Sequence, residues 1–559
     1  MAFLNRKSLG GVAFLVALVA VVLVFQLPAE AGKKHQAAAG TTLQKAKVKL
    51  GPPVRVDASA AAAAAPSAGL LPLEPQAVPF RPTMDQQAYE QAKTAAAAGP
   101  LAERTAPGAP ALGPALAPAF PPALTAVNFA GDTLTGWYPP DTTGAVGHDY
   151  YCQIVNSRFT VYDKTGGQLF QIPINDLFNY YGASAFDPQV LYDPVFRRWI
   201  VSADAFPEGG PATPQYFIMA VSDTADPTGT WLVWFFNTRV LGGEFFDYPH
   251  IGQDSRSIIV TANNFYNAGG YKDSRFFAWP KSMLYNELNS TIYFTMYFGW
   301  TVATIMPPVV LDTNRYSYLV SAAASDTNIW VIPFYTPATP IQNGSLANAY
   351  SVPVPSYGWP ANALQPGTLN VLDTLDSRFV NAGTQTGTGY LGAASLFQTH
   401  TVGYFGAGSI ATPRYYEFIL YPASGYLRQW DWFFCDNYSN DFNASIAANR
   451  FKDAFVTWSS TNWFYGINAQ VRFGGRRSFA DLGSGNFFPG VTLGGMAVSP
   501  VAAAGSATYY DWFRWGDYSC VTIDPAVPSG LTAWITNEVI YSSSAGGWGS
   551  QIAAITYLP

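Results

Sequence analysis

The residues of this chain that could carry chemistry lie at the openings of a recurring phrase. Two copies share an Asp-Tyr pair, "FFDYPHIGQD" (245–254) and "WGDYSC" (515–520). The acidic and phenolic side chains at these openings are Asp141, Asp187, Asp247, Asp517, Tyr248 and Tyr518. Carboxylates that gather in one place can hold a cation, bind sugar hydroxyls or serve as acid and base. A structural role is the competing interpretation, since Asp often accepts backbone N–H bonds in turns.

Two histidines add a second kind of chemistry. His250 follows Asp247 by three residues in the same short strand, where a neutral imidazole could abstract a proton or ligate a metal. A polysaccharide lyase would pair such a histidine with a tyrosine, and Tyr248 or Tyr518 is available. His400 stands in another copy of the phrase, in "FQTHTVGY". A buried, hydrogen-bonded structural role is the alternative for each histidine.

The chain shows no strong metal or cofactor pattern. The spacings H-x-x-x-H and C-x-x-C are absent, so we expect no structural zinc. The segment "CDNYSNDFN" (435–443) is rich in oxygen ligands and could hold calcium, but it lacks fixed ligand positions and is better interpreted as a polar loop. No phosphate-binding loop and no G-x-S-x-G motif occurs. We therefore expect no bound cofactor.

The elements that must position these residues follow from the phrase itself. Each copy has a polar opener, a short apolar strand, an Asp or Asn turn and a second strand rich in β-branched and aromatic residues. Copies begin at Pro139, Phe186, Phe246, Pro307, Gly367, Phe442 and Trp515. Each unit has room for four antiparallel strands, which predicts a seven-bladed β-propeller. The openers of the innermost strands would then gather at the mouth of a central channel.

The two ends of the repeat region support a closed ring. After Trp515 only three strands fit, so the last blade lacks one. Upstream of the first copy, "LTAVNFAGDTL" (124–134) is a spare strand that could complete it. Closure of this kind removes the exposed strand edges that favour aggregation.

Composition supports this fold class. Aromatic residues make up 16% of the chain and charged residues only 12%, which is typical of many half-buried strands in an all-β protein. The formal net charge of −6 argues against a nucleic-acid partner. Six tryptophans could stack on sugar faces where they are not core: Trp359, Trp430, Trp432, Trp458, Trp463 and Trp512.

Residues 1–123 differ in composition from the rest of the chain. Residues 1–31 have a basic start, an apolar run and an A-x-A site, which predicts a cleaved export signal, with an uncleaved membrane anchor as the alternative. Residues 32–123 are Ala- and Pro-rich and are predicted to be a disordered spacer, with a short helix near 84–98. The propeller is expected over 124–559. Three cysteines allow one disulfide at most, and free buried thiols are expected.

One short segment carries a family resemblance. "SDTADPTGTW" (222–231) resembles the Asp-box of sialidase-type propellers, a hairpin turn at a blade edge, with one extra residue between Asp226 and Gly229. The phrases "PPDTTGAVG", "DYPHIG", "THTV" and "RWGDYS" also look like those of a group of secreted bacterial propeller proteins. The resemblance implies a secreted propeller over most of 125–559. The Phe/Tyr-Arg-Ile-Pro phrase that introduces a sialidase site is absent, so sialidase activity is not expected.

Two functions remain open at this point. The first is a secreted, monomeric, extracellular propeller that binds a glycan or another cell-surface polymer at the channel mouth through Asp141, Asp187, Asp517 and Tyr518, and that inserts in no membrane after signal cleavage. The second is a glycoside hydrolase or polysaccharide lyase at the same place, with His250, His400, Asp247 and Tyr248 as catalytic candidates. We favour binding, because each candidate residue also has a structural explanation.

Overall fold

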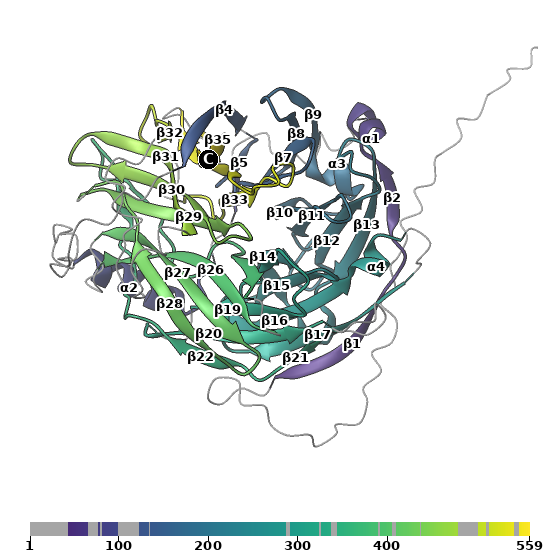
Figure 1. Ribbon diagram of the computed structural model, residues 1–559. Helices are drawn as coiled ribbons and strands as arrows, with labels where there is room; N and C mark the ends of the chain where they lie inside the picture. The colour runs from purple at the N-terminus through teal and green to yellow at the C-terminus, as the bar shows by residue number, and fades with distance from the viewer. Residues whose placement is uncertain are drawn as a thin grey trace, which may run out of the picture.

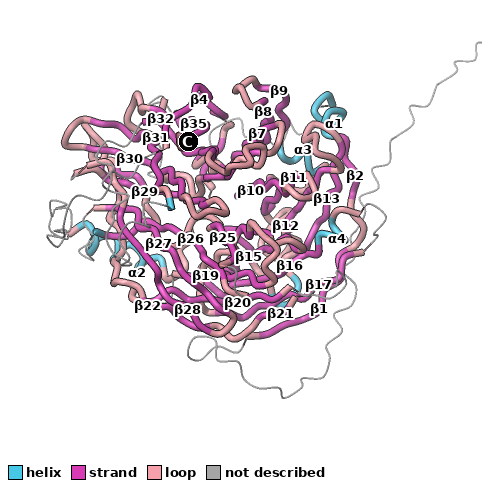
Figure 2. The backbone as a smooth tube through the Cα atoms, in the orientation of Figure 1, coloured by secondary structure: helices cyan, strands magenta, loops and turns pink. Residues whose placement is uncertain are grey.

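The protein is built almost wholly of β-strands that surround a common centre (Figure 1). The computed structural model describes residues 43–64, 76–78, 81–98, 122–133, 135–286, 291–322, 326–336, 344–388, 392–404, 410–436, 438–478, 501–509, 514–541 and 547–558. The helices are short: α1 (Ala58–Ala64), α2 (Gln86–Ala97), α3 (Ile174–Phe178) and α4 (Lys281–Leu284). Figure 2 shows how small their share is beside the strands. The predicted all-β class is confirmed.

The strands form antiparallel groups, each named here by its innermost strand. The β6 sheet contains β6 (Thr143–Val146), β7 (Tyr150–Val155), β8 (Arg158–Asp163) and β9 (Gln168–Pro173). The β10 sheet contains β10 (Ala185–Asp193), β11 (Arg198–Ala205), β12 (Tyr216–Ser222), β13 (Thr230–Asn237) and β2 (Val54–Asp57). The β14 sheet contains β14 (Phe245–Gln253), β15 (Ser257–Phe265), β16 (Tyr271–Pro280), β17 (Ile292–Trp300) and β1 (Gln44–Leu50).

The remaining groups complete the circuit. The β18 sheet contains β19 (Tyr316–Ser321) and β20 (Asn328–Tyr335), with β21 (Ser345–Leu346) and β22 (Tyr350–Pro353) both paired to β20. The short strand β18 (Val309–Val310), after which it is named, precedes β19 and pairs with β14 and β25, while a bridge from Met306 to Val320 connects this segment to β19. The β25 sheet contains β25 (Thr384–Gly387), β26 (Ala394–Gly403), β27 (Ala411–Tyr421) and β28 (Ser424–Trp432). The β29 sheet contains β29 (Asn440–Ala448), β30 (Ala454–Asn462), β31 (Ile467–Arg476) and β32 (Val501–Ala503). The β33 sheet contains β33 (Cys520–Ile523), β34 (Thr532–Ile540), β35 (Trp548–Thr556) and β4 (Ala123–Thr133).

Contacts between inner strands run around the centre. In chain order β6 contacts β10, β10 contacts β14, β14 contacts β18 and β18 contacts β25. The series continues from β25 to β29 and β33, and β33 contacts β6. β18 pairs in parallel with both β14 and β25, and this pairing joins the β14 and β25 sheets into one continuous sheet. Cores lie between neighbouring sheets; for example, Phe159 of β8 and Val201 of β11 belong to one buried cluster. Strands covered on both faces are buried along their length, as β11 is from Trp199 to Ala205.

The spare strand lies where the sequence predicted it. β4 pairs antiparallel with β35, the last strand of the chain, from Thr133 opposite Gly549 to Ala123 opposite Thr556. The pairing expected for Leu124 to Leu134 is therefore confirmed, apart from Leu134, which lies outside the described residues.

The predicted disordered spacer is wrong for part of residues 32–123. β1 extends the β14 sheet by pairing with β17, and β2 extends the β10 sheet by pairing with β13. Val48, Leu50 and Val56 are buried there. An alternation of apolar and charged residues in "KVKL" and "VRVD" satisfies the period of a strand, although the surrounding Ala- and Pro-rich composition obscures it. The expected helix near 84–98 is confirmed as α2.

The segment that resembles an Asp-box does form a hairpin turn, between β12 and β13. The Asp226 carboxylate accepts hydrogen bonds from the backbone N–H and hydroxyl of Thr228, at 2.9 and 2.8 Å. Trp231 is buried, and its indole N–H donates to the Pro227 carbonyl oxygen at 3.0 Å. The extra residue is thus accommodated without loss of the turn.

The sequence also predicts free buried thiols and an export signal. All three cysteines, Cys152, Cys435 and Cys520, are free and buried, as expected. The predicted export signal over 1–31 lies outside the described residues. Among the helices that are described, none has both the length and the apolar character needed to cross a bilayer.

Candidate functional site

Four of the inner-strand openings share an unusual backbone geometry. Asp141, Asp187, Tyr248 and Asn443 have φ of 48°, 50°, 56° and 48°, in the left-handed region that Asn and Asp tolerate better than other side chains. In β10, β14 and β29 the strand register shifts at this point, which marks a β-bulge. Bulges redirect side chains locally. The recurring phrase therefore encodes a repeated bend at one end of the inner strands.

The bends bring the predicted aspartates together. The Asp517 backbone N–H donates to Asp141 Oδ1 at 2.7 Å, and Asn156 Nδ2 donates to Asp141 Oδ2 at 2.6 Å. Asp517 also forms an ion pair with Arg514, three residues before it, at 2.9 Å. Asp187 is connected to this group by the Tyr518 hydroxyl, which donates a hydrogen bond to Asp187 Oδ2 at 3.0 Å. We call Asp141, Asp187, Asp247, Asp517, Tyr248, Tyr518 and His250 the central cluster.

Burial dominates the electrostatics of the central cluster. It raises the pKa of Asp141 to about 7, with the Asp517 carboxylate adding to the effect. It raises the pKa of Asp247 to about 6, although the nearby Arg81 guanidinium opposes the change. The pKa of Asp187 lies well above its usual value for the same reason, with Asp141 next in importance. Carboxyls of this kind are partly protonated near neutral pH.

Tyr248, His250 and Tyr518 form one aromatic stack within the cluster. The two tyrosine rings lie parallel with centroids 5.3 Å apart, and the His250 ring meets them edge-on at 4.5 and 5.5 Å. Burial, together with the nearby Arg378 guanidinium, lowers the pKa of His250 to about 3, so the imidazole is neutral. All three side chains are buried, with exposed fractions of 4%, 2% and 0%. The predicted His and Tyr pair is thus assembled but enclosed.

His400 occupies a different environment. Its Nδ1 bonds to the Ser377 carbonyl oxygen at 2.7 Å and its Nε2 to the Tyr416 hydroxyl at 2.9 Å. Burial lowers the pKa of His400 to about 3. Both ring nitrogens are therefore engaged in holding β26 to its surroundings, and the structure gives His400 no contact with His250.

The segment that contains α2 lies across the inner-strand openings. The Arg81 guanidinium lies 3.6 Å from the centre of the Phe245 ring and 3.8 Å from the Asp247 carboxylate. The buried Lys93 ammonium donates to the Pro360 and Leu375 carbonyl oxygens at 2.9 and 2.7 Å. The sequence interpretation missed both cations. The helix signal around 84–98 pointed to α2, but nothing local indicated its docking site.

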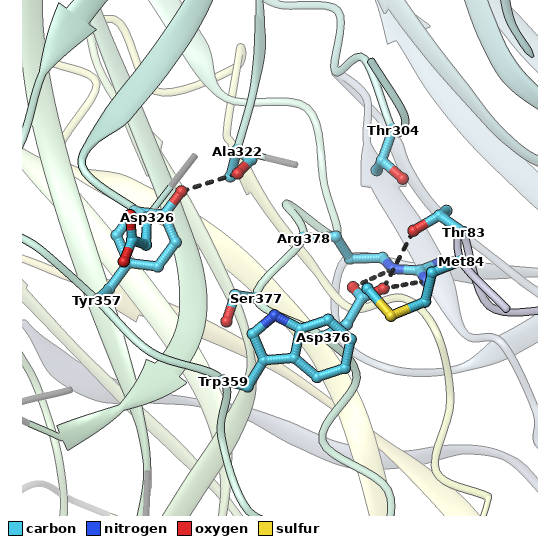
Figure 3. A pocket seen from close by; sticks show the side chains of 10 residues that line it. All are labelled: Thr83, Met84, Thr304, Ala322, Asp326, Tyr357, Trp359, Asp376, Ser377 and Arg378. Carbon is cyan, nitrogen blue, oxygen red and sulfur yellow. Dashed lines mark hydrogen bonds and ion pairs between the residues drawn. The ribbon is translucent and has the colours of Figure 1, made fainter. Parts of the chain in front are cut away.

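A pocket opens beside the central cluster, on the side of the β18 and β25 sheets (Figure 3). Its volume is about 270 Å³, and its lining residues are Thr83, Met84, Thr304, Ala322, Asp326, Tyr357, Trp359, Asp376, Ser377 and Arg378. We call it the mouth pocket. Arg378 joins it to the central cluster, because its guanidinium lies 4.9 Å from the centre of the Tyr248 ring.

The mouth pocket combines flat rings with charged groups. Arg378 bonds Asp376 through two nitrogens, at 2.6 and 2.7 Å. Burial acts to raise the pKa of Asp376, but the Arg378 guanidinium outweighs it and the pKa is lowered, so this carboxylate stays ionised. Figure 3 shows Trp359 beneath this ion pair, with Tyr357 and Asp326 across the pocket. Of the six tryptophans noted above, Trp432 and Trp458 are core, Trp359 is half-buried and Trp463 is exposed.

The oxygen-rich segment 435–443 uses its carboxylates within the protein. Asp436 Oδ1 accepts from the backbone N–H groups of Tyr438 and Ser439. Asp441 accepts from the Ser439 hydroxyl and the Trp458 indole N–H, at 2.6 and 2.9 Å. Over the described part of the chain, no group of three or more His, Cys, Asp or Glu side chains is arranged to hold a metal ion.

The chain was compared with family models, with curated proteins and with solved structures. No family model matches it, and no curated protein matches it. Among solved structures, a protein of unknown function from Dyadobacter fermentans is similar over 66% of this chain and 94% of its own, with 8% identity and a TM-score of 0.33. The polysaccharide lyase Uly1 is similar over 75% of this chain and 90% of its own, with 9% identity and a TM-score of 0.33. A Trypanosoma rangeli sialidase mutant is similar over 66% of this chain but only 53% of its own, with 8% identity and a TM-score of 0.30.

Proposed function

We propose that this protein binds a neutral glycan in the mouth pocket. The observation that carries the proposal is the combination of Trp359 and Tyr357 with the Asp376–Arg378 ion pair around one open space. Flat aromatic rings stack on the apolar faces of sugars, and fixed charged groups hydrogen-bond their hydroxyls. Two carboxylates, Asp326 and Asp376, face a single guanidinium there. This balance disfavours an anionic polysaccharide.

Binding accounts for the pocket better than catalysis does. Asp376 is held ionised by Arg378, so it is poorly suited to donate a proton. His250 and Tyr248, the predicted catalytic pair, are not among the residues that line the pocket. The assembled stack of His250 with Tyr248 and Tyr518 is the one feature that favours a lyase as the second candidate, and it would need the segment 81–98 to move aside.

The architecture proposed to carry this site is a seven-bladed propeller. The β6, β10, β14, β18, β25, β29 and β33 sheets are its blades, and β4 completes the last of them. The chain is exported by its first 31 residues, and the protein acts outside the cell as a monomer. Sequencing the mature N-terminus of the expressed full chain tests the export step.

Replacing the pocket tryptophan tests the proposal. We expect Trp359→Ala to raise the Kd for the preferred polysaccharide about 30-fold, the factor that corresponds to about 2 kcal/mol for a central aromatic contact. The measurement is affinity gel electrophoresis against mixed-linkage glucan, arabinoxylan, galactomannan and galactan, followed by calorimetry. Tyr426→Ala, which removes an exposed ring from β28, is the matched control and should bind normally.

The same samples separate binding from catalysis. Binding without release of shorter chains supports the proposal. Chain cleavage that disappears in His250→Ala would instead identify the protein as an enzyme of the second kind.

A further inference from the structure

A group of exposed aromatic side chains projects from the β29 sheet. The turn that joins β30 to β31 reads Trp463, Phe464, Tyr465 and Gly466, and its three rings are 42%, 58% and 59% exposed. Tyr438, 37% exposed, packs against Phe464 with ring centroids 5.2 Å apart. We call these four rings the aromatic turn. Large apolar groups gathered on a surface are uncommon in a soluble protein unless they contact a ligand or partner.

The turn that presents these rings is held rigidly. Asn462 Oδ1 accepts from the backbone N–H groups of Phe464 and Tyr465, at 2.9 and 3.0 Å. Its Nδ2 donates to both Asp436 oxygens, at 2.8 and 2.9 Å. Gly466 supplies the positive φ of 70° that ends the turn. A turn backbone fixed in this way loses little conformational entropy on binding.

The aromatic turn lies on the same face of the molecule as the mouth pocket. In the β29 sheet, Asn440 pairs with Thr461, so the turn after β30 is level with the opening of the inner strand. The pocket is lined by Thr304 and Ser377, which precede the inner strands of the β18 and β25 sheets. A direct link also exists, since the Thr508 hydroxyl is 3.2 Å from the Pro366 carbonyl oxygen and 3.4 Å from Asn468 Oδ1. Pro366 follows Trp359 after the short strand β23 (Ala363–Leu364), and Asn468 lies at the start of β31, directly after the aromatic turn.

We infer that the aromatic turn is a second subsite for the same neutral polysaccharide, which therefore extends from the mouth pocket across the face of the β29 sheet. This inference rests on the proposed function. The ligand is accordingly a polymer, and a short oligosaccharide fills only the pocket. A membrane surface is the rival occupant of exposed Trp, Phe and Tyr, but interfacial anchors combine such rings with Lys or Arg. Neither 436–443 nor 459–468 contains a basic residue.

The test combines three variants of the full chain with two lengths of ligand. The first variant carries Trp463→Ala, Phe464→Ala and Tyr465→Ala together and keeps Asn462. The second is Trp359→Ala. The control is Phe451→Ala, which removes a 51% exposed ring from the turn between β29 and β30, at the opposite end of the same sheet. Each is measured against mixed-linkage glucan, arabinoxylan, galactomannan and galactan, and against trisaccharides of the same polymers.

We expect the triple variant to bind the preferred polymer at least tenfold more weakly than the wild type and to bind its trisaccharide equally well. Trp359→Ala should weaken both, and Phe451→Ala should change neither. Polymer binding that is unchanged in the triple variant but lost in Trp359→Ala would overturn this inference and leave the proposed function standing. Polymer binding lost in the triple variant but unchanged in Trp359→Ala would place the ligand on the aromatic turn alone and overturn the proposed pocket. Sedimentation of the wild type, but not the triple variant, with phosphatidylcholine vesicles would show a membrane contact instead.

Discussion

Deletion of residues 124–133 is expected to abolish the cooperative unfolding transition of the protein, because β4 joins three sheets at once. It pairs along β35 within the β33 sheet. Its Asn128 side chain donates to the Ala502 carbonyl oxygen of β32 at 2.9 Å. Its Asp132 accepts from the Thr160 hydroxyl of β8 at 2.7 Å. Without β4, the last sheet loses its outer strand and that strand's side-chain contacts with the first sheet, and β35 becomes an unpaired edge that favours aggregation.

The size of the effect follows from what β4 buries. Leu124 packs against the buried cluster between the β29 and β33 sheets, and Val127 and Phe129 pack against the cluster between the β33 and β6 sheets. These three side chains are half-buried, so each contributes part of the roughly 1.5–3 kcal/mol that full burial gives, and each hydrogen bond of β4 adds about 1 kcal/mol. The total is on the order of 5–10 kcal/mol, comparable with the 5–15 kcal/mol or so that keeps a typical domain folded.

Circular dichroism during heating measures this result, and point variants separate packing from simple loss of chain. Asp132→Ala keeps β4 but removes the carboxylate that accepts from the Thr160 hydroxyl, the Gln171 amide and the Arg158 guanidinium, so its melting temperature should fall. Ala130→Ser changes an exposed position of the same strand and should melt like the wild type. An unchanged melting temperature after the deletion would show that β4 is dispensable.

The repeat could be recognised from sequence because its cause is local. Several openers place one residue in the left-handed backbone region, which Asp or Asn tolerates well, as at Asp141, Asp187 and Asn443. The strand that follows needs apolar residues on both faces. Both requirements fall within a few residues of one another, so each copy of the repeat has a recognisable sequence pattern. The partner of β35 was predictable for a related reason: a strand without its own sheet has to pair somewhere.

The rest of the site depends on contacts between distant segments. Lys93 bonds to Pro360 and Leu375, more than 260 residues away along the chain. The two strands β1 and β2 add to sheets that begin well over a hundred residues later. No local pattern specifies such partners. Burial of the central cluster was missed for the same reason, because the segment around Arg81 covers openings that the repeat alone would leave facing solvent.

The second large effect concerns pH. We expect the free energy of unfolding to fall as pH rises from about 4.5 to about 7.5. In the folded state burial raises the pKa of Asp141 from 3.8 to about 7. Between those values the folded state holds a proton that the unfolded state has released, so raising the pH favours unfolding. The stability from this group is complete below about pH 4 and is lost as pH passes through about 7.

Two histidines act in the opposite direction. Burial lowers the pKa of both His250 and His400 to about 3, so acid favours the unfolded state, which can protonate them. The carboxyls outnumber them, since burial raises the pKa of a larger set: Asp141, Asp187, Asp204, Asp247, Asp431, Asp517 and Glu538. Two histidines contribute about 5 kcal/mol between pH 4.5 and 7.5, because one pKa unit corresponds to about 1.36 kcal/mol. The stability that Asp141, Asp247 and Asp431 together lose over the same interval exceeds this histidine contribution.

The clean measurement is the difference between the wild type and Asp141→Asn, since the histidine contribution cancels. Urea unfolding at pH 4.5 and 7.5 should show the wild type losing about 3 kcal/mol more than the variant over this interval, from the pKa of about 7. Asp187→Asn should flatten the dependence in the same way, because burial also raises its pKa. Asp163→Asn is the control. Hydrogen bonds from Thr165 and Gly167 lower the pKa of Asp163, so it stays ionised throughout and its removal should leave the slope unchanged. If Asp141→Asn keeps the wild-type slope, the carboxyl of Asp141 is ionised in the folded protein, and the openings of the inner strands must be accessible to water.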